Sequence, residues 1–314
     1  MGETNAGPGS QQSRSGGFRA SLFKTITRLA SSGAQRLGFE RSNGTILTSG
    51  EMRHYLLHVP GNLDPSKPVP LVITFHGFAE WPVHVMRTSR WSDLADRHGF
   101  IVVYPSGSGM PKRWRTGITG LKPDDAAADV QFAADLLAEL QHRYHIDPKR
   151  IYLNGFSNGA GFSHMLALEW ADRIAAFGSV SGALLYPTQG RSLARPVPFI
   201  AFHGTKDRIV PFHGGPTGHF QFTFPPVTDW VHAWAELDGC DPKPATIFNS
   251  PHVTGQQYLG GNPAGEVVFY TIDGGGHAWP GGVPLPRWIA GRTTKEIDAT
   301  EIMWQFFVRH PLSD

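Results

Sequence analysis

Short apolar runs alternate with amphipathic segments along most of the chain after residue 40. The apolar runs are predicted strands, and they cover residues 44–47, 52–59, 69–75, 100–104, 151–154, 176–180, 198–202 and 267–272. The amphipathic segments are predicted helices, and they lie at 129–144, 158–171 and 228–237 and near 91–97 and 294–309. An opening hairpin followed by alternating strands and helices predicts an α/β fold, with a mostly parallel central sheet covered by helices on both faces.

The first 40 residues lack this regular pattern. Residues 1–17 are mostly Gly, Ser, Gln and Asn, and we expect them to be disordered. Residues 18–38 carry apolar side chains at helix-like spacing, but Lys24 and Arg28 interrupt the apolar centre that a signal peptide needs. Two interpretations stay open for this segment. It is either an amphipathic basic helix that contacts a membrane or the domain surface, or a poorly ordered leader.

Composition limits the classes of protein that the chain can belong to. Its 314 residues and 40 % hydrophobic content suffice for one large domain, which we place at residues 41–314. A formal net charge of +2 is too small to predict nucleic acid as a partner. No apolar run is long enough for a transmembrane segment, and no Cys/His spacing predicts a metal site. The single cysteine, Cys240, excludes an internal disulfide and leaves both a cytoplasmic and an exported location open.

The most informative string is Gly-Phe-Ser-Asn-Gly at residues 155–159. It directly follows the predicted strand 151–154 and leads into the predicted helix 158–171. Proteins of the α/β-hydrolase fold hold a nucleophilic serine, here Ser157, on a sharp turn in this context. Glycine is needed on both sides because a side chain there would collide with the neighbouring strand or helix. The alternative is that Ser157 is an ordinary turn serine in a glycine-rich chain.

A serine nucleophile needs a histidine base and an acid, which follow it in the chain order Ser, Asp or Glu, His. Asp207 comes just after the predicted strand 198–202, and His277 comes just after the predicted strand 267–272. Taken singly, the aspartate can be a turn residue and the histidine a hydrogen-bonded loop residue. Asp273 is a rival acid, but its position fits the end of the strand better. Order and context together predict a catalytic triad.

The same chemistry requires N–H groups that stabilise the oxyanion of the tetrahedral intermediate. The backbone N–H of Asn158, at the start of the predicted helix, is one candidate because the helix dipole favours negative charge there. The N–H of Phe78, in the loop after the strand 69–75, is the other. His76 in that loop is expected to have a structural role.

With these residues identified, the chain resembles the α/β-hydrolase esterase family that groups poly(3-hydroxybutyrate) depolymerases with feruloyl and acetylxylan esterases. The similarity extends over residues 44–312, and the strings that carry it lie at 75–77, 151–160, 203–207, 239–240, 275–282 and 297–300. The most specific of them is His-Ala-Trp-Pro-Gly-Gly, which begins at His277. The resemblance implies that Ser157, Asp207 and His277 form the triad and that Trp279 lies beside the substrate.

The substrate pocket is predicted from aromatic residues near these motifs. Trp114 and Phe212 lie on loops that follow predicted strands, and with Trp279 they can form an apolar acyl pocket. The alternative is that these rings only pack their loops onto the domain. The stretch 183–196 is too short to fold as a separate lid, so we expect an open site without a large lid.

The sequence therefore predicts a serine carboxylic-ester hydrolase of the feruloyl or acetyl esterase type or the polyhydroxybutyrate depolymerase type. Its expected substrate is a small or polymeric ester, and no cofactor is required. One alternative is an acyltransferase that uses the same triad, and another is a binding module that has lost catalysis. Acyl and alcohol preference and the oligomeric state do not follow from the sequence.

Overall fold

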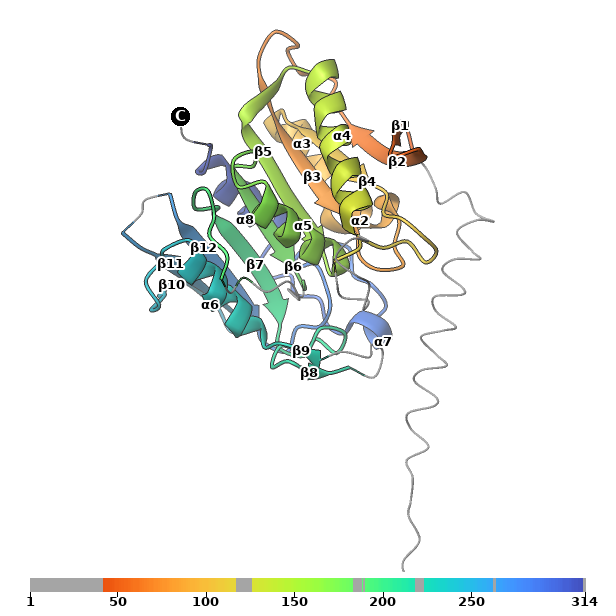
Figure 1. Ribbon diagram of the computed structural model, residues 1–314. Coiled ribbons are helices and arrows are strands. Elements are labelled where there is room, and N and C mark those ends of the chain that lie inside the picture. The colour runs from red at the N-terminus through yellow and green to blue at the C-terminus, as the bar shows by residue number, and fades with distance from the viewer. Residues whose placement is uncertain are drawn as a thin grey trace, which may run out of the picture.

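The computed structural model describes residues 42–116, 126–182, 188, 190–217, 223–261 and 264–312. The predictions for residues 1–40 lie outside these ranges. Within the described residues the main sheet has ten strands in the order β1-β2-β4-β3-β5-β6-β7-β12-β11-β10 (Figure 1). The strands are β1 (Gly44–Thr48), β2 (Glu51–His58), β3 (Val69–Phe75), β4 (Ile101–Pro105), β5 (Ile146–Phe156), β6 (Ala176–Val180), β7 (Phe199–Gly204), β10 (Ala245–Asn249), β11 (Val253–Leu259) and β12 (Glu266–Ile272). A separate small hairpin pairs β8 (Gly215–Pro216) with β9 (Thr223–Phe224).

The centre of the sheet is parallel and its two margins are antiparallel. Neighbouring pairs from β4 through β3, β5, β6 and β7 to β12 are parallel. At one margin β1 and β2 add antiparallel strands, and at the other β11 and β10 do the same. The carboxyl ends of the parallel strands consequently share one edge, where ligands of such sheets bind. The predicted α/β fold with a mostly parallel sheet is confirmed.

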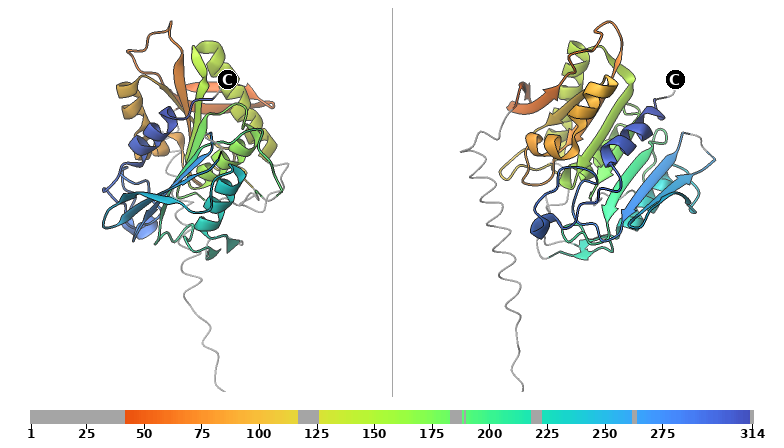
Figure 2. Two further views of the ribbon diagram at one scale, coloured as in Figure 1. Left: turned by 90° about the vertical axis from the view of Figure 1, so that its left-hand side faces the viewer. Right: turned by 180° about the vertical axis from the view of Figure 1, so that it is seen from behind.

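Helices cover both faces of the sheet (Figure 2). One face carries α4 (Ala127–Arg143), α5 (Asn158–Glu169) and α6 (Val227–Leu237), and the other carries α3 (Trp91–His98) and α8 (Ala299–Val308). In β3, Leu71 and Ile73 pack toward the first group of helices, whereas Val72 packs toward the second. This alternation explains why the central strands read as continuous apolar runs, since both of their faces are buried.

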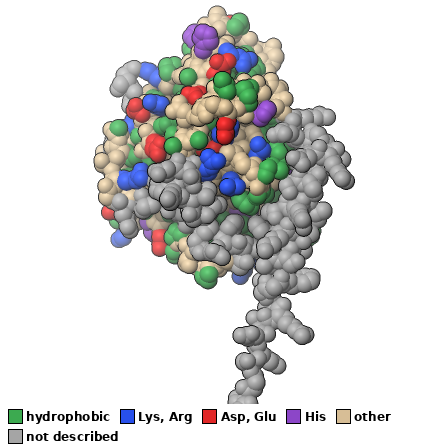
Figure 3. Space-filling view, turned by 45° about the vertical axis from the view of Figure 1, so that its right-hand side comes forward, with side chains coloured by type: hydrophobic (Ala, Val, Ile, Leu, Met, Phe, Trp, Pro, Cys, Tyr) green, Lys and Arg blue, Asp and Glu red, His purple; other side chains and the backbone are tan. Residues whose placement is uncertain are grey.

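Polar side chains are distributed over the outside of the domain. Acidic and basic side chains are interspersed over the face shown in Figure 3. Every helix within the described residues is too short or too polar to cross a bilayer. In the same part of the chain, no group of three or more His, Cys, Asp or Glu side chains is arranged to hold a metal ion.

One buried histidine sits in the apolar layer between α5 and the sheet. The His164 ring is 0 % exposed and lies 4.6 Å from the Trp234 ring and 5.9 Å from the Phe177 ring, centroid to centroid. Neither ring nitrogen has a hydrogen-bond partner among the described residues. Burial lowers the pKa of His164 from 6.5 to about 3, because the charged ring would lose its hydration. His164 is therefore neutral in the folded protein.

Replacing His164 with leucine should make the protein less sensitive to acid. Because the native pKa is lowered, His164 does not reduce the free energy of unfolding above pH 6.5. Between pH 6.5 and about 3 only the unfolded chain binds the proton, so the free energy of unfolding falls progressively as the pH falls. Relative to the wild type, the free energy of unfolding of His164→Leu should rise by about 2–3 kcal/mol as the pH falls from about 6.5 to 4.5. Urea unfolding at several pH values measures this difference. The exposed His142→Leu is the control, and an equal pH slope in wild type and His164→Leu would contradict the prediction.

Candidate active site

Ser157 occupies a strained turn between β5 and α5. Its backbone has φ 54° and ψ −117°, in the left-handed half of conformational space that non-glycine residues rarely enter. A Cβ on Gly155 would lie 2.3 Å from the carbonyl carbon of Gly159, and one on Gly159 would lie 2.3 Å from the carbonyl oxygen of Phe75. Both glycines are thus required by close backbone packing, as the sequence predicted. The turn leaves Ser157 partly exposed at the edge of the sheet.

Asp207 and His277 meet at the same edge. Asp207 follows β7, His277 follows β12, and these two strands are parallel neighbours in the sheet. The Nδ1 atom of His277 donates a hydrogen bond to the Oδ2 atom of Asp207 over 2.7 Å. The two residues are only 4 % and 5 % exposed, so this charged contact is shielded from water. Since Nδ1 carries the shared proton, Nε2 is the nitrogen that can accept another.

The Asp207 carboxylate is held by several donors. Its Oδ1 atom accepts hydrogen bonds from the backbone N–H groups of Ile209 and Val210, at 2.8 and 2.9 Å. The Nε2 atom of His203 lies 3.4 Å from Oδ2, but it donates its hydrogen bond to the carbonyl of Val210. Burial alone would raise the pKa of Asp207, but the charge and hydrogen bond of His277 together with these donors lower it below its usual value. Asp207 therefore remains a carboxylate at neutral pH.

The residue before Ser157 packs against His277. The ring of Phe156, the last residue of β5, is 4.9 Å from the His277 ring, centroid to centroid. The Ser157 N–H donates to the carbonyl of Val180 at the end of β6, which separates β5 from β7 in the sheet. The three predicted triad residues thus come from loops at one edge of four adjacent strands.

The loop after β3 is fixed by two side chains. The Nδ1 atom of His76 donates to the carbonyl of Gly77, and its Nε2 atom accepts from the N–H of Gly107. Burial lowers the pKa of His76 to about 3, which keeps this ring neutral and suits it to these two contacts. The Glu80 carboxylate accepts from the Gly77 N–H at 2.9 Å. These contacts orient the backbone that leads to Phe78, and they agree with a structural role for His76.

Asn158 contributes more than a backbone N–H. Its side-chain amide pairs with the backbone of Trp114, accepting from the N–H at 2.7 Å and donating to the carbonyl at 2.9 Å. The first residue of α5 therefore holds the loop after β4 against the Ser157 turn. As the first residue of an α-helix, Asn158 also has a backbone N–H without an intrahelical acceptor.

A buried ion pair also holds the loop after β4. The Arg53 guanidinium lies 2.9 Å from the Asp129 carboxylate, and the two side chains are 7 % and 0 % exposed. Asp129 also accepts hydrogen bonds from the Ser108 hydroxyl and the Arg115 N–H. Arg53 further donates to the carbonyl of Ser106 and covers the face of an aromatic ring in α4. The ion pair thus connects β2 and α4 to the loop after β4.

The predicted aromatic pocket differs from what the structure shows. Trp114 is 0 % exposed and packs between Phe75 and Phe162, with centroid distances of 5.0 and 4.7 Å. The Trp114 ring therefore belongs to the core, which agrees with the alternative that it packs its loop onto the domain. Phe212 is half-buried and packs against the same core, stacked on Phe269 at 6.3 Å.

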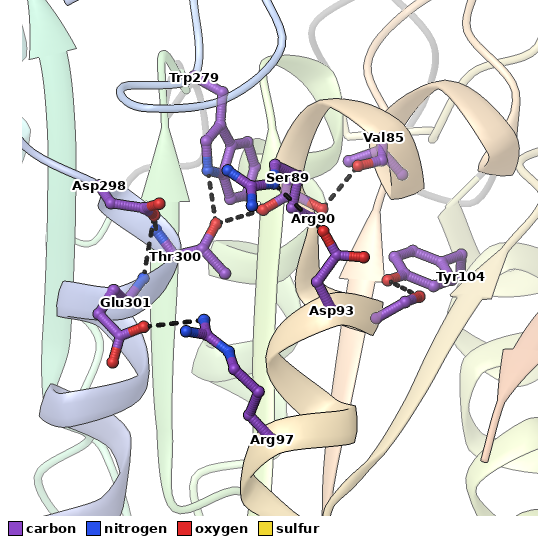
Figure 4. Close-up of polar contacts among 11 residues, drawn as sticks. Val85, Ser89, Arg90, Asp93, Arg97, Tyr104, Trp279, Asp298, Thr300 and Glu301 are labelled. Carbon is purple, nitrogen blue, oxygen red and sulfur yellow. Dashed lines mark hydrogen bonds and ion pairs between the residues drawn. The ribbon is translucent and has the colours of Figure 1, made fainter. Parts of the chain in front are cut away.

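Trp279 is buried in the interior of the protein. Its ring is 1 % exposed, and its Nε1 atom donates to the hydroxyl of Thr300 at the start of α8. The Thr300 hydroxyl in turn donates to the carbonyl of Ser89, at the end of α2 (Pro82–Ser89) (Figure 4). The expectation that Trp279 lies beside the substrate does not fit this burial. Instead, Trp279 ties the loop that begins at His277 to two helices.

Three contributors to the site escaped the sequence reasoning. They are His203 beside the acid, Glu80 on the loop after β3, and the side chain of Asn158. The position of His203 four residues before Asp207 was the only local signal. The partners of Glu80 and Asn158 lie on loops that the linear sequence does not bring together.

Comparison with known proteins finds a similar family. Residues 54–194 match the family model described as Esterase PHB depolymerase. The chain is similar to this esterase family over that segment. The matched segment includes Ser157 and the loop after β3.

Two of the sequence relatives are named as esterases. A bifunctional acetylxylan esterase/xylanase of Neocallimastix patriciarum is 36 % identical over 162 residues, which is 51 % of this chain and 22 % of that protein. Feruloyl esterase B of Piromyces equi is 30 % identical over 240 residues, which is 72 % of this chain and 42 % of that protein. The chain thus spans less than half the length of either relative. A putative esterase of Nocardia uniformis, 28 % identical, matches 84 % of this chain and 81 % of its own length.

Solved structures share the fold at lower identity. The acetyl xylan esterase from Aspergillus awamori superposes with a TM-score of 0.58 at 17 % identity, covering 84 % of this chain and 98 % of that chain. An S-formylglutathione hydrolase from Agrobacterium tumefaciens superposes with a TM-score of 0.55 at 12 % identity, covering 85 % and 94 %. Both likenesses establish the α/β-hydrolase fold of this chain.

Proposed function

We propose that this protein is a serine carboxylic-ester hydrolase that works through an acyl-enzyme on Ser157. The observation that carries the proposal is the buried hydrogen bond between His277 and Asp207 at the edge where the strained turn presents Ser157. A serine hydroxyl, a histidine whose other nitrogen is held by a carboxylate, and a helix N-terminus together supply nucleophile, base and anion stabilisation. The family and the named relatives support the same reaction class.

The reaction follows from the protonation states at the site. Nε2 of His277 takes the hydroxyl proton of Ser157 as the serine oxygen attacks the ester carbonyl. The N–H groups of Phe78 and Asn158 stabilise the oxyanion that forms. The carbonyl then re-forms, the C–O bond to the alcohol breaks, and His277 returns its proton to the leaving oxygen. Water enters, loses a proton to His277 and repeats the attack, which releases the acid and restores Ser157.

Asp207 has the task of orienting and stabilising the histidine. Its lowered pKa keeps it charged while His277 carries two protons in each half-reaction. The backbone donors from Ile209 and Val210 fix the carboxylate, so Oδ2 stays directed at Nδ1. This arrangement favours the tautomer of His277 that leaves Nε2 available to accept the serine proton.

The substrate class is proposed from the named relatives. They include feruloyl and acetylxylan esterases and a poly(3-hydroxyalkanoate) depolymerase of Paucimonas lemoignei. We therefore expect hydrolysis of at least one of three esters, namely methyl ferulate, an acetylated xylo-oligosaccharide and a soluble 3-hydroxybutyrate oligomer.

Product release from these three esters, followed with the purified protein, tests the proposal. A fluorophosphonate probe should label Ser157 in the wild type in parallel, and the Ser157→Ala protein is the blank for both assays. Hydrolysis of one ester with labelling at Ser157 supports the proposal. No release from any of the three esters together with no labelling would overturn it.

A further inference from the structure

A cavity of about 230 Å³ opens beside the loops that carry the triad acid and base. Its lining includes Gly274, residues 288–291 and four basic residues, which are Lys206, Arg208, Arg287 and Arg292. All four are exposed, and no acidic side chain lines the cavity. Within the described residues, none of the four forms an ion pair with a carboxylate. The cavity is therefore a concentrated positive site.

The cavity is joined to the triad through the backbone. Lys206 and Arg208 flank Asp207 in the sequence, and the N–H of Lys206 donates to the carbonyl of Gly275 at 2.8 Å. The N–H of Gly276, next to His277, donates to the carbonyl of Arg292 at 2.9 Å. These bonds fix the cavity relative to the triad. Figure 1 shows its short helix α7 (Arg287–Ala290) at the carboxyl end of the parallel strands.

The backbone that lines the cavity packs closely against the glycines that precede His277. A Cβ on Gly276 would lie 2.0 Å from the carbonyl oxygen of Ala290, the last residue of α7. The segment that carries Arg287 and Arg292 therefore rests directly on the glycines that precede His277. A group bound in the cavity therefore lies against the loop that leads to His277.

The chemistry of the lining selects an anion. Like charges repel when gathered at one place, and an anion between them relieves that repulsion. Guanidinium groups match the planar carboxylate with two parallel hydrogen bonds. Trp288 is 69 % exposed and offers a flat apolar face to the atoms that carry the anion. The volume is below that of pockets for whole drug-sized ligands, about 300–1,000 Å³, so it suits one part of a larger substrate.

We infer that this cavity binds a carboxylate of the ester substrate, so that the enzyme prefers acidic esters to neutral ones of the same size. The inference rests on the proposed function, because it assigns the cavity to a second group of the same substrate. Two sources provide such a carboxylate. One is a uronate unit of an esterified polysaccharide, and the other is the free acid end of a hydroxyacid oligomer.

Two matched pairs of esters distinguish these sources. The first pair is an acetylated methyl glycoside of glucuronic acid and the same acetylated glycoside of glucose. The second is a 3-hydroxybutyrate trimer with a free carboxylate and the corresponding amide. The acidic member should have the higher kcat/KM in at least one pair, and the pair that shows the preference identifies the source. Raising the salt from about 0.05 to 0.5 M should reduce this preference by screening the charges.

Charge-neutral variants link the preference to the cavity. Arg287→Gln and Arg292→Gln should each lower kcat/KM for the acidic ester about fivefold, mainly through KM, and leave the neutral ester unchanged. Lys243→Gln, an exposed lysine outside the cavity, is the matched control and should change neither substrate. Equal kcat/KM for acidic and neutral esters, or equal losses in the variants and the control, would overturn the inference while the proposed function stands.

A binding experiment keeps the two proposals separate. Ser157→Ala protein is titrated with glucuronate, with the acid trimer and with glucose, and its tryptophan fluorescence is followed, with an added Trp288→Phe substitution as the blank. Quenching by either acid alone, lost in Arg287→Gln/Arg292→Gln, supports the cavity even if no ester is hydrolysed. The inference is overturned if neither acid gives a response up to the KM of the acidic ester. Where no ester is hydrolysed, the limit is about 10 mM, which corresponds to a binding free energy of less than 3 kcal/mol.

Discussion

Replacing Ser157 with alanine is expected to lower kcat for a hydrolysed ester by roughly 10⁶-fold, the loss found when the nucleophile of a comparable triad is removed. The methyl group of alanine cannot attack a carbonyl, and the remaining rate would come from substrate binding and the oxyanion donors alone. Thermal stability should change little, because Ser157 is partly exposed and alanine keeps the Cβ that already fits the strained turn. Kinetics with a chromogenic acetyl ester and a melting curve measure the two effects.

A second serine in the same helix provides the control for that experiment. Ser163 is buried, and its hydroxyl only donates to the carbonyl of Gly159 one turn earlier. Ser163→Ala should therefore retain most of the activity. A Ser157→Ala protein with more than about one per cent of wild-type kcat would show that another group is the nucleophile, since a triad that loses its serine keeps far less.

Replacing Arg53 with methionine should destabilise the protein by about 3–5 kcal/mol, because the Asp129 carboxylate would stay buried without its partner. Methionine keeps part of the side-chain volume but supplies no charge and no donor for the carbonyl of Ser106. The loop after β4, which Asp129 holds through Ser108 and Arg115, should loosen as well. Urea unfolding followed by tryptophan fluorescence measures the loss of stability.

A double variant separates the loss of the ion pair from the loss of packing. Arg53→Met combined with Asp129→Leu removes both charges and should recover part of the lost stability. The exposed pair of Arg90 and Asp93 supplies the matched control, and Arg90→Met should cost less than about 1 kcal/mol. If Arg53→Met were no more destabilising than Arg90→Met, the ion pair would have no structural importance.

The sequence predicted the parts of the fold that local patterns encode. Strands such as β3 and β7 are buried on both faces and read as unbroken apolar runs, so their positions follow directly. By contrast, β10 is exposed at four of its five residues and gives almost no apolar signal. The last helix starts at residue 299 instead of 294, because the Asp298 side chain caps it by accepting from two backbone N–H groups.

The candidate triad could be proposed from the sequence because its signals are local strings that follow strands. The aromatic residues could not be assigned in the same way, since a ring near a motif looks the same in a core as in a pocket. Trp114 and Trp279 became core residues because their indole N–H groups find acceptors inside the protein, a carbonyl of His76 and the hydroxyl of Thr300. Such pairings depend on contacts between distant segments, which one sequence does not reveal.

The hydrogen bonds that join Trp279 to Thr300 and Thr300 to Ser89 have a consequence for the order in which the molecule is made. Ser89 and Thr300 lie 211 positions apart, and Thr300 belongs to the last helix that the structure describes. A ribosome that has completed Ser157 and Asp207 has yet to synthesise the anchor for the histidine loop. The nascent chain can therefore complete the proposed triad only after Thr300 has been synthesised, and until then it should be inert toward esters.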